Sequence, residues 1–548
     1  MQFITTEDFI EALYSASNYL EQNKTKVNDL NVFPVPDGDT GTNMSMTIKS
    51  AVKQVKSTSA KAIDEVAAEM SRGALMGARG NSGVILSQLF RGFAEGLKGK
   101  EKVDTQSLAY AMKKASEMTY LAVMKPTEGT ILTVGRESAE FAMKNAKKYK
   151  DILEFLEAVI ARAKESLSNT PNLLPVLKEA GVVDAGGQGL VTILEGAYLA
   201  LKGEAVTSIG EEEATVSKGA PVRSEISTDN IKFGYCTEFI VTTESDHVED
   251  LKAKLVERGD SLLVVGDDKM IKVHVHTNDP GLALQSGLEF GFLKDIKIDN
   301  MRIQHSERLF SADQVKEKQA EEKHEDASPL KPYGFVSICA GEGIESIFKD
   351  VGVDYLVTGG QTMNPSTEDI LAGINKVNAE HIFVLPNNSN IFLAAEAAAD
   401  IAEKDVTVLK TRSIPEGITA CIHFMPDQSV KDNIEAMMAA VEDLKTAQVT
   451  YAVRDTEMDG ITIKKGDFIG LSGKKIVSKG PSIEETTIDV LKYMIDEDSS
   501  FISLYAGSDV DDEGIASLES ALDEAYPDLD YDVMRGDQPI YYYLISVE

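Results

Sequence analysis

The chain has 548 residues, 43% of them hydrophobic, and this length predicts about three or four domains. Its formal net charge of −34 excludes nucleic acid and anionic membrane surfaces as partners. Its 3 cysteines are too few and too scattered for a disulfide framework, which indicates a reducing compartment. Because the first residues lack the pattern of a signal peptide and no apolar run approaches the roughly 20 residues of a membrane span, we expect a cytoplasmic protein without a direct membrane span.

Residues 1–203 are expected to form an all-α domain. Thr5 or Thr6 should cap a first helix that carries apolar residues at helical spacing. Further amphipathic stretches predict helices at 60–76, 84–97, 106–123, 130–148, 151–167 and 188–202. A helical domain of this kind can hold a ligand at the end where its loops meet.

The stretch 31–44 carries the first chemical signal. It reads Asn-Val-Phe-Pro-Val-Pro-Asp-Gly-Asp-Thr-Gly-Thr-Asn-Met, and the residues 44–55 are predicted to be helical. Asp37 and Asp39 stand beside the predicted helix start, where unpaired N–H groups and a partial positive charge favour anions. Carboxylates there can hold Mg²⁺, and the cation can hold phosphate. The alternative is an acidic turn that only caps a helix.

Two familiar loops for cations and phosphates do not fit this stretch. A calcium-binding EF-hand loop that starts at Asp37 would need glycine at its sixth position and glutamate at its twelfth, where the chain has Thr42 and Ile48. The phosphate loop G-x-x-x-x-G-K-[ST] occurs nowhere in the sequence. The prediction is therefore a metal–phosphate site of a different kind.

Three later segments have the small residues that a phosphate site needs. Residues 76–83, Met-Gly-Ala-Arg-Gly-Asn-Ser-Gly, open a predicted helix, and Glu-Gly-Thr at 128–130 and Val-Asp-Ala-Gly-Gly-Gln-Gly at 183–189 follow. Glycine lets backbone N–H groups approach a phosphate closely. Taken singly, each glycine is as well explained by an ordinary turn or helix C-cap.

Together the four segments resemble the nucleotide-binding L-type domain of dihydroxyacetone kinases, and the whole chain resembles the catalytic subunit of bacterial fatty acid kinase. The resemblance implies a helical-barrel domain that binds ATP and Mg²⁺. Asp37 and Asp39 would be catalytic and would ligate Mg²⁺, with Asn31 as a further ligand. Arg79 would neutralise transferred charge; a surface ion pair is the alternative. The implied ATP contacts are Thr40, Thr42, Asn43, Gly80, Asn81, Ser82, Thr130, Asp184, Gly186 and Gly187.

Residues 226–310, which follow a polar linker at 204–225, are expected to form an α+β domain. The predicted order of strand, helix, strand, strand, helix and strand is that of a ferredoxin-like unit, in which the third strand lies between the first and second and is antiparallel to both. Cys236 in the first strand would then meet His274 and His276 in the third, and this is a ligand set for Zn²⁺. The alternative is a half-buried cysteine beside two hydrogen-bonded histidines.

Residues 333–548, after a charged linker at 311–332, are expected to form an α/β domain. Strands predicted at 334–339, 354–358, 381–385 and 406–410 alternate with helices, which is typical of a parallel sheet, and a strand-rich end follows. The residues Thr-Met-Asn-Pro-Ser at 362–366 resemble the T-S-x-P-S loop of DegV-type fatty-acid-binding proteins. Because Met363 and Asn364 depart from that loop, we expect a domain for carrier docking or dimerisation.

The resemblance implies a kinase subunit that uses ATP to phosphorylate the carboxylate of a fatty acid, giving an acyl phosphate for phospholipid synthesis. A carrier protein of the DegV type would present the fatty acid, and the chain would form a homodimer. One alternative is a kinase subunit for dihydroxyacetone. The extra domains are evidence against it, and so is Thr40, which stands where the dihydroxyacetone kinases often have histidine. The other is a non-enzymatic scaffold that senses nucleotide or metal.

Overall fold

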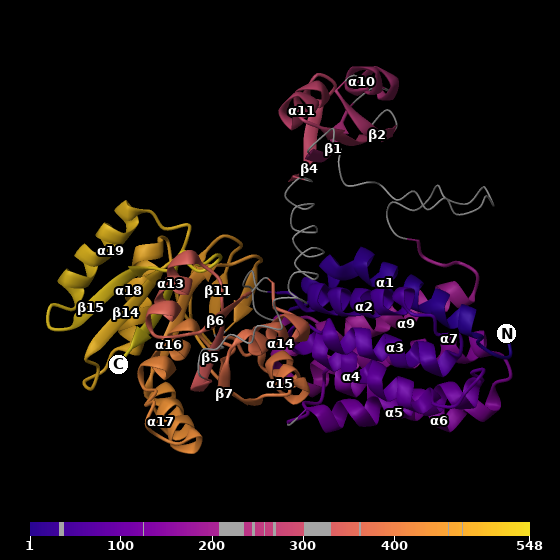
Figure 1. The fold of residues 1–548 in the computed structure, drawn as a ribbon, viewed down its shortest axis with the longest axis horizontal. Coiled ribbons are helices and arrows are strands. Elements are labelled where there is room, and N and C mark those ends of the chain that lie inside the picture. Colours follow the sequence, from indigo (N-terminus) through magenta and orange to yellow (C-terminus); the bar gives the residue numbers. More distant parts are fainter. Residues whose placement is uncertain are drawn as a thin grey trace. The chain divides into compact units, whose positions relative to one another are not determined.

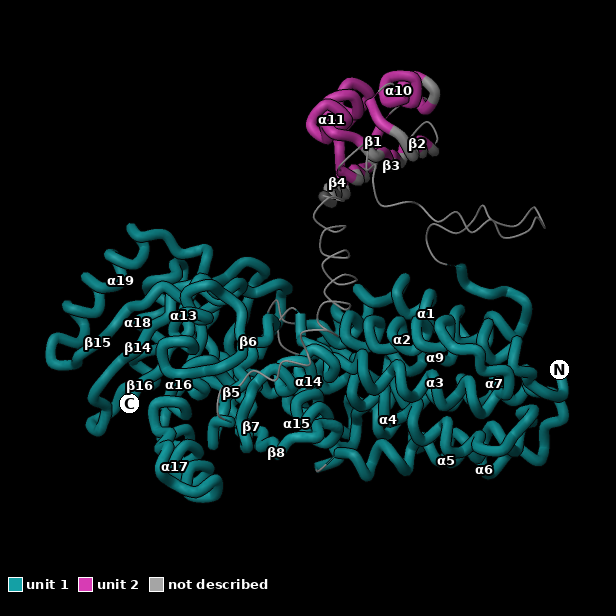
Figure 2. The backbone as a smooth tube through the Cα atoms, in the orientation of Figure 1, with its two compact units in different colours: residues 1–215, 330–548 teal, residues 216–329 magenta. Residues whose placement is uncertain are grey.

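The computed structural model divides the chain into two compact units (Figure 2). Residues 1–215 and 330–548 form the first unit, and residues 216–329 form the second. The expected helical and C-terminal domains therefore pack together, although the whole middle segment separates them in the sequence. The structure describes residues 1–31, 38–123, 125–207, 235–243, 247–256, 258–266, 270–300, 330–360, 363–458, 460–473 and 475–548, without some of the side chains between 235 and 300.

The described residues between 1 and 207 form the predicted all-α domain (Figure 1). The hydroxyl of Thr5 accepts a hydrogen bond from the backbone N–H of Asp8, so Thr5 is the N-cap of the first helix, in agreement with the prediction. The helices are α1 (Thr6–Asn28), α2 (Thr40–Ser57), α3 (Ile63–Met76), α4 (Gly80–Leu97), α5 (Thr105–Ala122), α6 (Ile131–Asn145), α7 (Ile152–Leu173), α8 (Pro175–Ala180) and α9 (Ala185–Leu201), with a 3₁₀ turn η1 at Ala146–Lys148.

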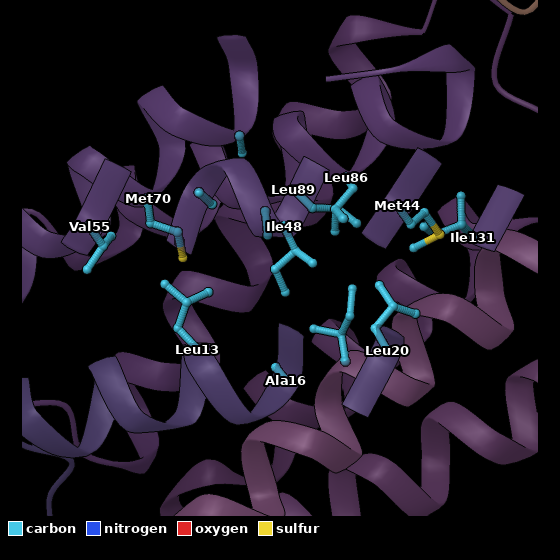
Figure 3. Packing of buried hydrophobic residues seen from close by; sticks show 14 of the residues in the cluster. Leu13, Ala16, Leu20, Met44, Ile48, Val55, Met70, Leu86, Leu89 and Ile131 are labelled. Atoms are coloured by element: carbon cyan, nitrogen blue, oxygen red, sulfur yellow. The ribbon is translucent and has the colours of Figure 1, made fainter. Parts of the chain in front are cut away.

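The core of the helical domain is built around α2. Met44 and Ile48 of α2 are fully buried and pack with Leu20 of α1 and Leu86 of α4 in one apolar cluster (Figure 3). Burying a side chain of this size contributes about 1.5–3 kcal/mol to folding. Because Met44 lies in the second turn of α2, this packing also fixes the position of the N-terminal end of that helix.

The C-terminal part begins with the predicted parallel sheet. Its strand order is β6-β5-β7-β8, and every neighbouring pair is parallel. The strands are β5 (Lys331–Cys339), β6 (Tyr355–Thr358), β7 (Ala379–Leu385) and β8 (Asp405–Val408), and the helices of this region are α13 (Glu342–Asp350), α14 (Thr367–Lys376), α15 (Phe392–Ile401), α16 (Ile414–Ile422) and α17 (Val430–Asp443).

The strand-rich end forms a second sheet with the order β13-β12-β9-β16-β14-β15. The strands predicted for this end, at 448–454, 461–464, 467–470, 501–505 and 540–546, do not include the two edge strands β13 and β15. Both edge strands contain Lys or Asp residues, which disfavour strands, so their strand signal is weak. The strands of this sheet and the helices between them are β9 (Lys445–Tyr451), β12 (Phe468–Ser472), β13 (Lys475–Gly480), α18 (Ile483–Met494), β14 (Phe501–Ala506), α19 (Asp512–Ala525), β15 (Asp530–Arg535) and β16 (Tyr543–Val547). The strands β10 (Thr456–Met458) and β11 (Ile461–Ile463) pair with each other in a separate two-stranded sheet.

The helical and C-terminal domains share an apolar core. Ala78 and Val84, at the start of α4, belong to the same buried cluster as Ile338 of β5 and Ile370 of α14. The backbones also pair, since the N–H of Thr367 donates to the carbonyl of Ala78 at 3.1 Å. The C-terminal domain is therefore fixed against the segment that the sequence analysis assigned to phosphate binding.

The second unit contains the predicted α+β elements in the predicted order. The observed sheet order is β2-β3-β1-β4, so the third strand lies between the first two and is antiparallel to both, as expected. The elements are β1 (Tyr235–Thr242), α10 (Val248–Leu255), β2 (Gly259–Gly266), β3 (Met270–Thr277), α11 (Pro280–Leu288) and β4 (Phe292–Asn300). Across the described parts of both units, no helix combines the length and the apolar character that crossing a membrane would require.

Candidate functional site: a cleft at four helix N-termini

A cleft with a volume of about 510 Å³ opens at one end of the helical domain. The N-terminal ends of four helices line it: Asp39 and Thr40 at α2, Asn81 and Ser82 at α4, Thr130 and Ile131 at α6, and Asp184 and Ala185 at α9. Each helix N-terminus carries a partial positive charge and has N–H groups without partners inside the helix. Four of them around one cleft favour a ligand that carries several negative charges.

The start of α2 is capped by a side chain other than that of Asp39. Asp39 is the N-cap residue, yet its side chain makes no capping hydrogen bond. Asn28 of α1 does this work instead, because its Oδ1 accepts the N–H groups of Gly41 at 2.7 Å and Thr42 at 3.1 Å. Thr40 donates its hydroxyl to Oδ1 of Asn31 at 2.7 Å. The carboxylate can therefore meet a ligand without uncapping the helix.

The start of α4 combines a glycine in the left-handed conformation with two polar side chains. Gly80 has a φ of +55°, and a Cβ there would collide with the amide of Asn43, so only glycine fits between these segments. The next two residues, Asn81 and Ser82, line the cleft. Oδ1 of Asn81 is buried and has no hydrogen-bond partner among the described residues, so it could accept a hydrogen bond from a ligand or contact a cation.

The N-terminal ends of α6 and α9 form another part of the cleft lining. Thr130 caps α6 and donates its hydroxyl to the carbonyl of Thr127 at 2.7 Å. Asp184 caps α9 by accepting the N–H of Gly187 at 2.7 Å. Burial raises the pKa of the Asp184 carboxyl to about 6, although the hydrogen bonds that it accepts act in the opposite direction. Lys125 adds a positive charge to the lining.

The structure brings most of the predicted site residues together. Those that line the cleft are Asn31, Asp39, Thr40, Asn43, Asn81, Ser82, Thr130, Asp184 and Gly186. Thr42, Gly80 and Gly187 support the helix starts but are not among the described lining residues. Asp37 lies outside the described residues, so its proposed role as a magnesium ligand stays a prediction.

Arg79 occupies a position that differs from the expected one. Its Nη1 donates to the carbonyl of Asn364 at 2.8 Å, and its Nη2 lies 3.3 Å from Oδ2 of Asp369. Both partners belong to the C-terminal domain, and Arg79 is not among the described lining residues of the cleft. The structure therefore shows the ion pair that the sequence analysis gave as the alternative, and the catalytic role of Arg79 stays a prediction.

The sequence analysis missed several residues of the cleft. Lys125 and Thr127 lie just before the Glu-Gly-Thr segment, and Leu177 comes from the short helix α8. Ser389 and Asn390 come from the loop after β7 in the C-terminal domain. The position of that loop is a signal for a ligand site, since ligand sites of parallel sheets form beyond the carboxyl ends of the strands. The sequence could not show that Ser389 meets Asn81, because the two residues are more than 300 positions apart.

The predicted zinc ligands of the second unit are adjacent in the backbone register. Cys236 pairs with His276 across the β1–β3 ladder, and His274 pairs with Glu238 on the same ladder. The side chains of these residues lie outside the described part of the structure. Among the side chains that the structure does describe, no three histidine, cysteine or acidic residues gather as a metal site.

The three parts of the chain each match a known family model. Residues 34–199 match the DAK2 domain, residues 232–308 match the middle domain of the FakA-like fatty acid kinase subunits, and residues 334–548 match the C-terminal domain of the same subunits. Among solved structures, the chain is similar to the dihydroxyacetone kinase from C. freundii in complex with AMP-PNP and Mg²⁺, with 17% identity, a TM-score of 0.28, and coverage of 35% of this chain and 33% of that one.

Two curated relatives extend over almost the whole chain. Protein YloV of Bacillus subtilis is 41% identical over 550 residues, and an uncharacterized protein of Staphylococcus haemolyticus is 42% identical over 548 residues. Each match covers 98% of this chain and 98% of the relative. With this full-length similarity, and with the matching models in the same order along the sequence, the chain belongs to the FakA-like family of fatty acid kinase subunits.

Proposed function

We propose that the chain is an ATP-dependent kinase subunit that phosphorylates the carboxylate of a fatty acid presented by a DegV-type carrier protein. The product would be an acyl phosphate that serves phospholipid synthesis. The observation that carries the proposal is the cleft in which four helix N-termini surround the Asp39 carboxylate. A protein with a net charge of −34 would otherwise repel a nucleotide, so binding needs such a local site.

The residues present fit ATP with Mg²⁺. The Asp39 carboxylate is relieved of capping by Asn28, and the carbonyl oxygen of Asn81 is buried without a described partner. Asp39, together with Asp37 and Asn31, would hold Mg²⁺, while the start of α4 would hold the phosphates. Thr130 and the start of α9 would hold the rest of the nucleotide. The bound cation would neutralise the charge of the phosphates.

The proposed reaction needs the protein mainly to position the reactants and to neutralise their charge. A carboxylic acid has a pKa of about 4, so the acceptor is already ionised at neutral pH and needs no general base. A carboxylate oxygen forms a bond to the γ-phosphorus while the bond from that phosphorus to the β–γ bridging oxygen breaks, and ADP leaves with the electron pair. The helix N-termini and Lys125 would hold the phosphates in line and reduce their repulsion of the incoming carboxylate.

A separate carrier fits the shape of the C-terminal domain. At the carboxyl ends of its parallel strands, the pocket beside Cys339, Gly359 and Asn387 has a volume of only about 20 Å³. That is room for about one water molecule and not for an acyl chain. The described part of this domain therefore suits docking of a carrier or of a second copy of the chain, as the sequence analysis proposed.

The identity of the acceptor is the direct test of this function. With γ-labelled ATP and Mg²⁺, we expect label to move to lipid when the chain is mixed with an oleate-loaded carrier of the DegV type. The same carrier without fatty acid is the control and should give no labelled lipid. Transfer to dihydroxyacetone, with none to the oleate of the carrier, would instead support a triose kinase.

We also propose that the middle unit binds zinc through Cys236, His274 and His276. The support is the backbone register, which places Cys236 opposite His276. Elemental analysis of the purified chain should find about one zinc per chain, and Cys236→Ser should lose it. Cys421→Ser is the matched control, because burial raises the pKa of the Cys421 thiol to about 12 and keeps it protonated. A wild-type chain without zinc would disprove this proposal.

A further inference from the structure

The C-terminal domain contacts the proposed nucleotide site at three places. Asn364, in the loop after β6, donates from Nδ2 to Oδ2 of Asp39. Asn81, at the start of α4, donates from Nδ2 to the carbonyl of Ser389 at 3.2 Å. Arg454, in the turn after β9, donates to the carbonyls of Asp29 at 2.8 Å and Asn31 at 2.5 Å. The contacts thus involve both the residues around the start of α2 and the start of α4, which is proposed to hold the phosphates.

Asn364 is the contact that bears on the chemistry. Its side chain belongs to a residue that is only 1% exposed, and Oδ1 has no hydrogen-bond partner among the described residues. A buried carbonyl oxygen without a partner costs about 1–3 kcal/mol. The backbone of this residue is held in place, because its carbonyl accepts from Arg79 at 2.8 Å. A buried amide that donates to a carboxylate and leaves its own oxygen unsatisfied is poorly explained by packing alone.

An amide has oxygen and nitrogen on two arms of nearly equal shape. In the structure the nitrogen arm of Asn364 faces Asp39, which satisfies the carboxylate. A half-turn of the amide about its last side-chain bond places the oxygen in the same space. A carboxylate oxygen and an amide oxygen together are the donors that Mg²⁺ prefers. One side chain can therefore serve both states of Asp39, with and without a cation.

We propose that Asn364, which bonds Asp39 from outside the described lining of the cleft, is part of the magnesium site, so that the C-terminal domain contributes to the kinase centre. This inference rests on the proposed function, because it assumes that Asp39 binds the cation that accompanies the nucleotide. It also gives the C-terminal domain a role inside the reaction, beyond docking. A partner that binds the C-terminal domain and moves Asn364 would change the affinity of the site for Mg²⁺.

The test measures the Mg²⁺ concentration that gives half-maximal binding of fluorescent mant-ADP to the full chain. Asn364→Ala removes the amide and should raise this concentration about 10-fold. Asn364→Asp has the same shape but adds a carboxylate, which is a stronger magnesium ligand, so it should lower the concentration about 3-fold or more. Opposite shifts in the two variants are a signature that a purely structural role does not produce.

Asn433→Ala is the matched control. Asn433 is also 1% exposed and lies in the C-terminal domain, but its side chain bonds the backbone of Met425 and Gln428. Its loss should leave the half-saturating Mg²⁺ concentration unchanged. If Asn364→Ala does not fold, the direction of the shift in Asn364→Asp alone decides the question.

The inference would be overturned if the half-saturating Mg²⁺ concentration were the same in the Asn364 variants and the wild type, or if it shifted in the same direction in both variants. If Asp39→Ala removes the Mg²⁺ dependence in that case, the proposed function stands without it. Should Asp39→Ala bind mant-ADP with the Mg²⁺ dependence of the wild type, the magnesium site itself would be disproved, and this inference would fail with it.

Discussion

Replacing Asp39 with alanine should lower the rate of ATP-dependent phosphoryl transfer by about 10³-fold or more. Lys125 is the only basic residue in the described lining of the cleft, so a bound cation would supply most of the charge neutralisation that the transition state needs. A loss of about 4 kcal/mol of transition-state stabilisation corresponds to this factor. Transfer of label from γ-labelled ATP to the oleate of the loaded carrier measures the effect.

Two further variants test whether the loss of activity comes from the charge of Asp39 or from a general effect of removing a side chain. Asp39→Asn keeps the size of the side chain but removes its charge, so it should retain more activity than alanine and still lose at least about 10²-fold. Glu165→Ala removes an exposed carboxylate on α7 of the same domain, and it should keep the wild-type rate. If Asp39→Ala turned over at the wild-type rate, the assignment of this cleft to catalysis would be abandoned.

Replacing Gly92 with alanine should destabilise the helical domain by about 2–3 kcal/mol. Gly92 lies where α4 crosses α5, and an added Cβ would overlap the carbonyl oxygen of Lys114 and lie 2.7 Å from Cα of Ala115. These are backbone atoms, so the two helices must separate, which leaves gaps in the core between them. The midpoint of thermal unfolding, followed by circular dichroism, measures the loss.

Gly135→Ala is the matched control, since Gly135 is also a glycine inside a helix, α6. A Cβ there would meet only methyl groups of Leu190 and Leu89, at 3.7 and 3.8 Å, which are ordinary contact distances. Alanine is a better helix former than glycine by roughly 1 kcal/mol, so this variant should be as stable as the wild type or more stable. Equal stability of the two variants would show that α4 and α5 are less tightly packed than the structure indicates.

Local sequence patterns predicted much of the helical domain. Thr5 begins α1 as expected, because a cap depends on the hydroxyl and on the residue three positions later. The motif at 31–44 predicted the site for the same reason, since Asp39, Thr40 and Asn43 lie within one turn of the start of α2. The order of strands in the middle unit also followed from the alternation of strand and helix signals.

Where the prediction fell short, the deciding contact joined distant residues. Asn28 is the last residue of α1, and its side chain reaches the start of α2 and caps it in place of Asp39. Arg79 has the type and place of a phosphate-binding residue, but it pairs with Asp369 of the C-terminal domain. A side chain with several possible partners goes to the one that folding brings nearest, and the local sequence does not specify which.

The sequence by itself determined most helices of the first domain, the cap at Thr5 and the acidic segment of the proposed nucleotide site, because these depend on residues a few positions apart. Only the tertiary structure decided that the C-terminal domain forms part of that site. Asp39 and Asn364 are 325 positions apart, and they meet because Ala78 and Val84 are buried in the apolar core of the C-terminal domain. Burial of apolar surface has no direction of its own, so it is the packing of whole domains that sets which polar side chains face each other.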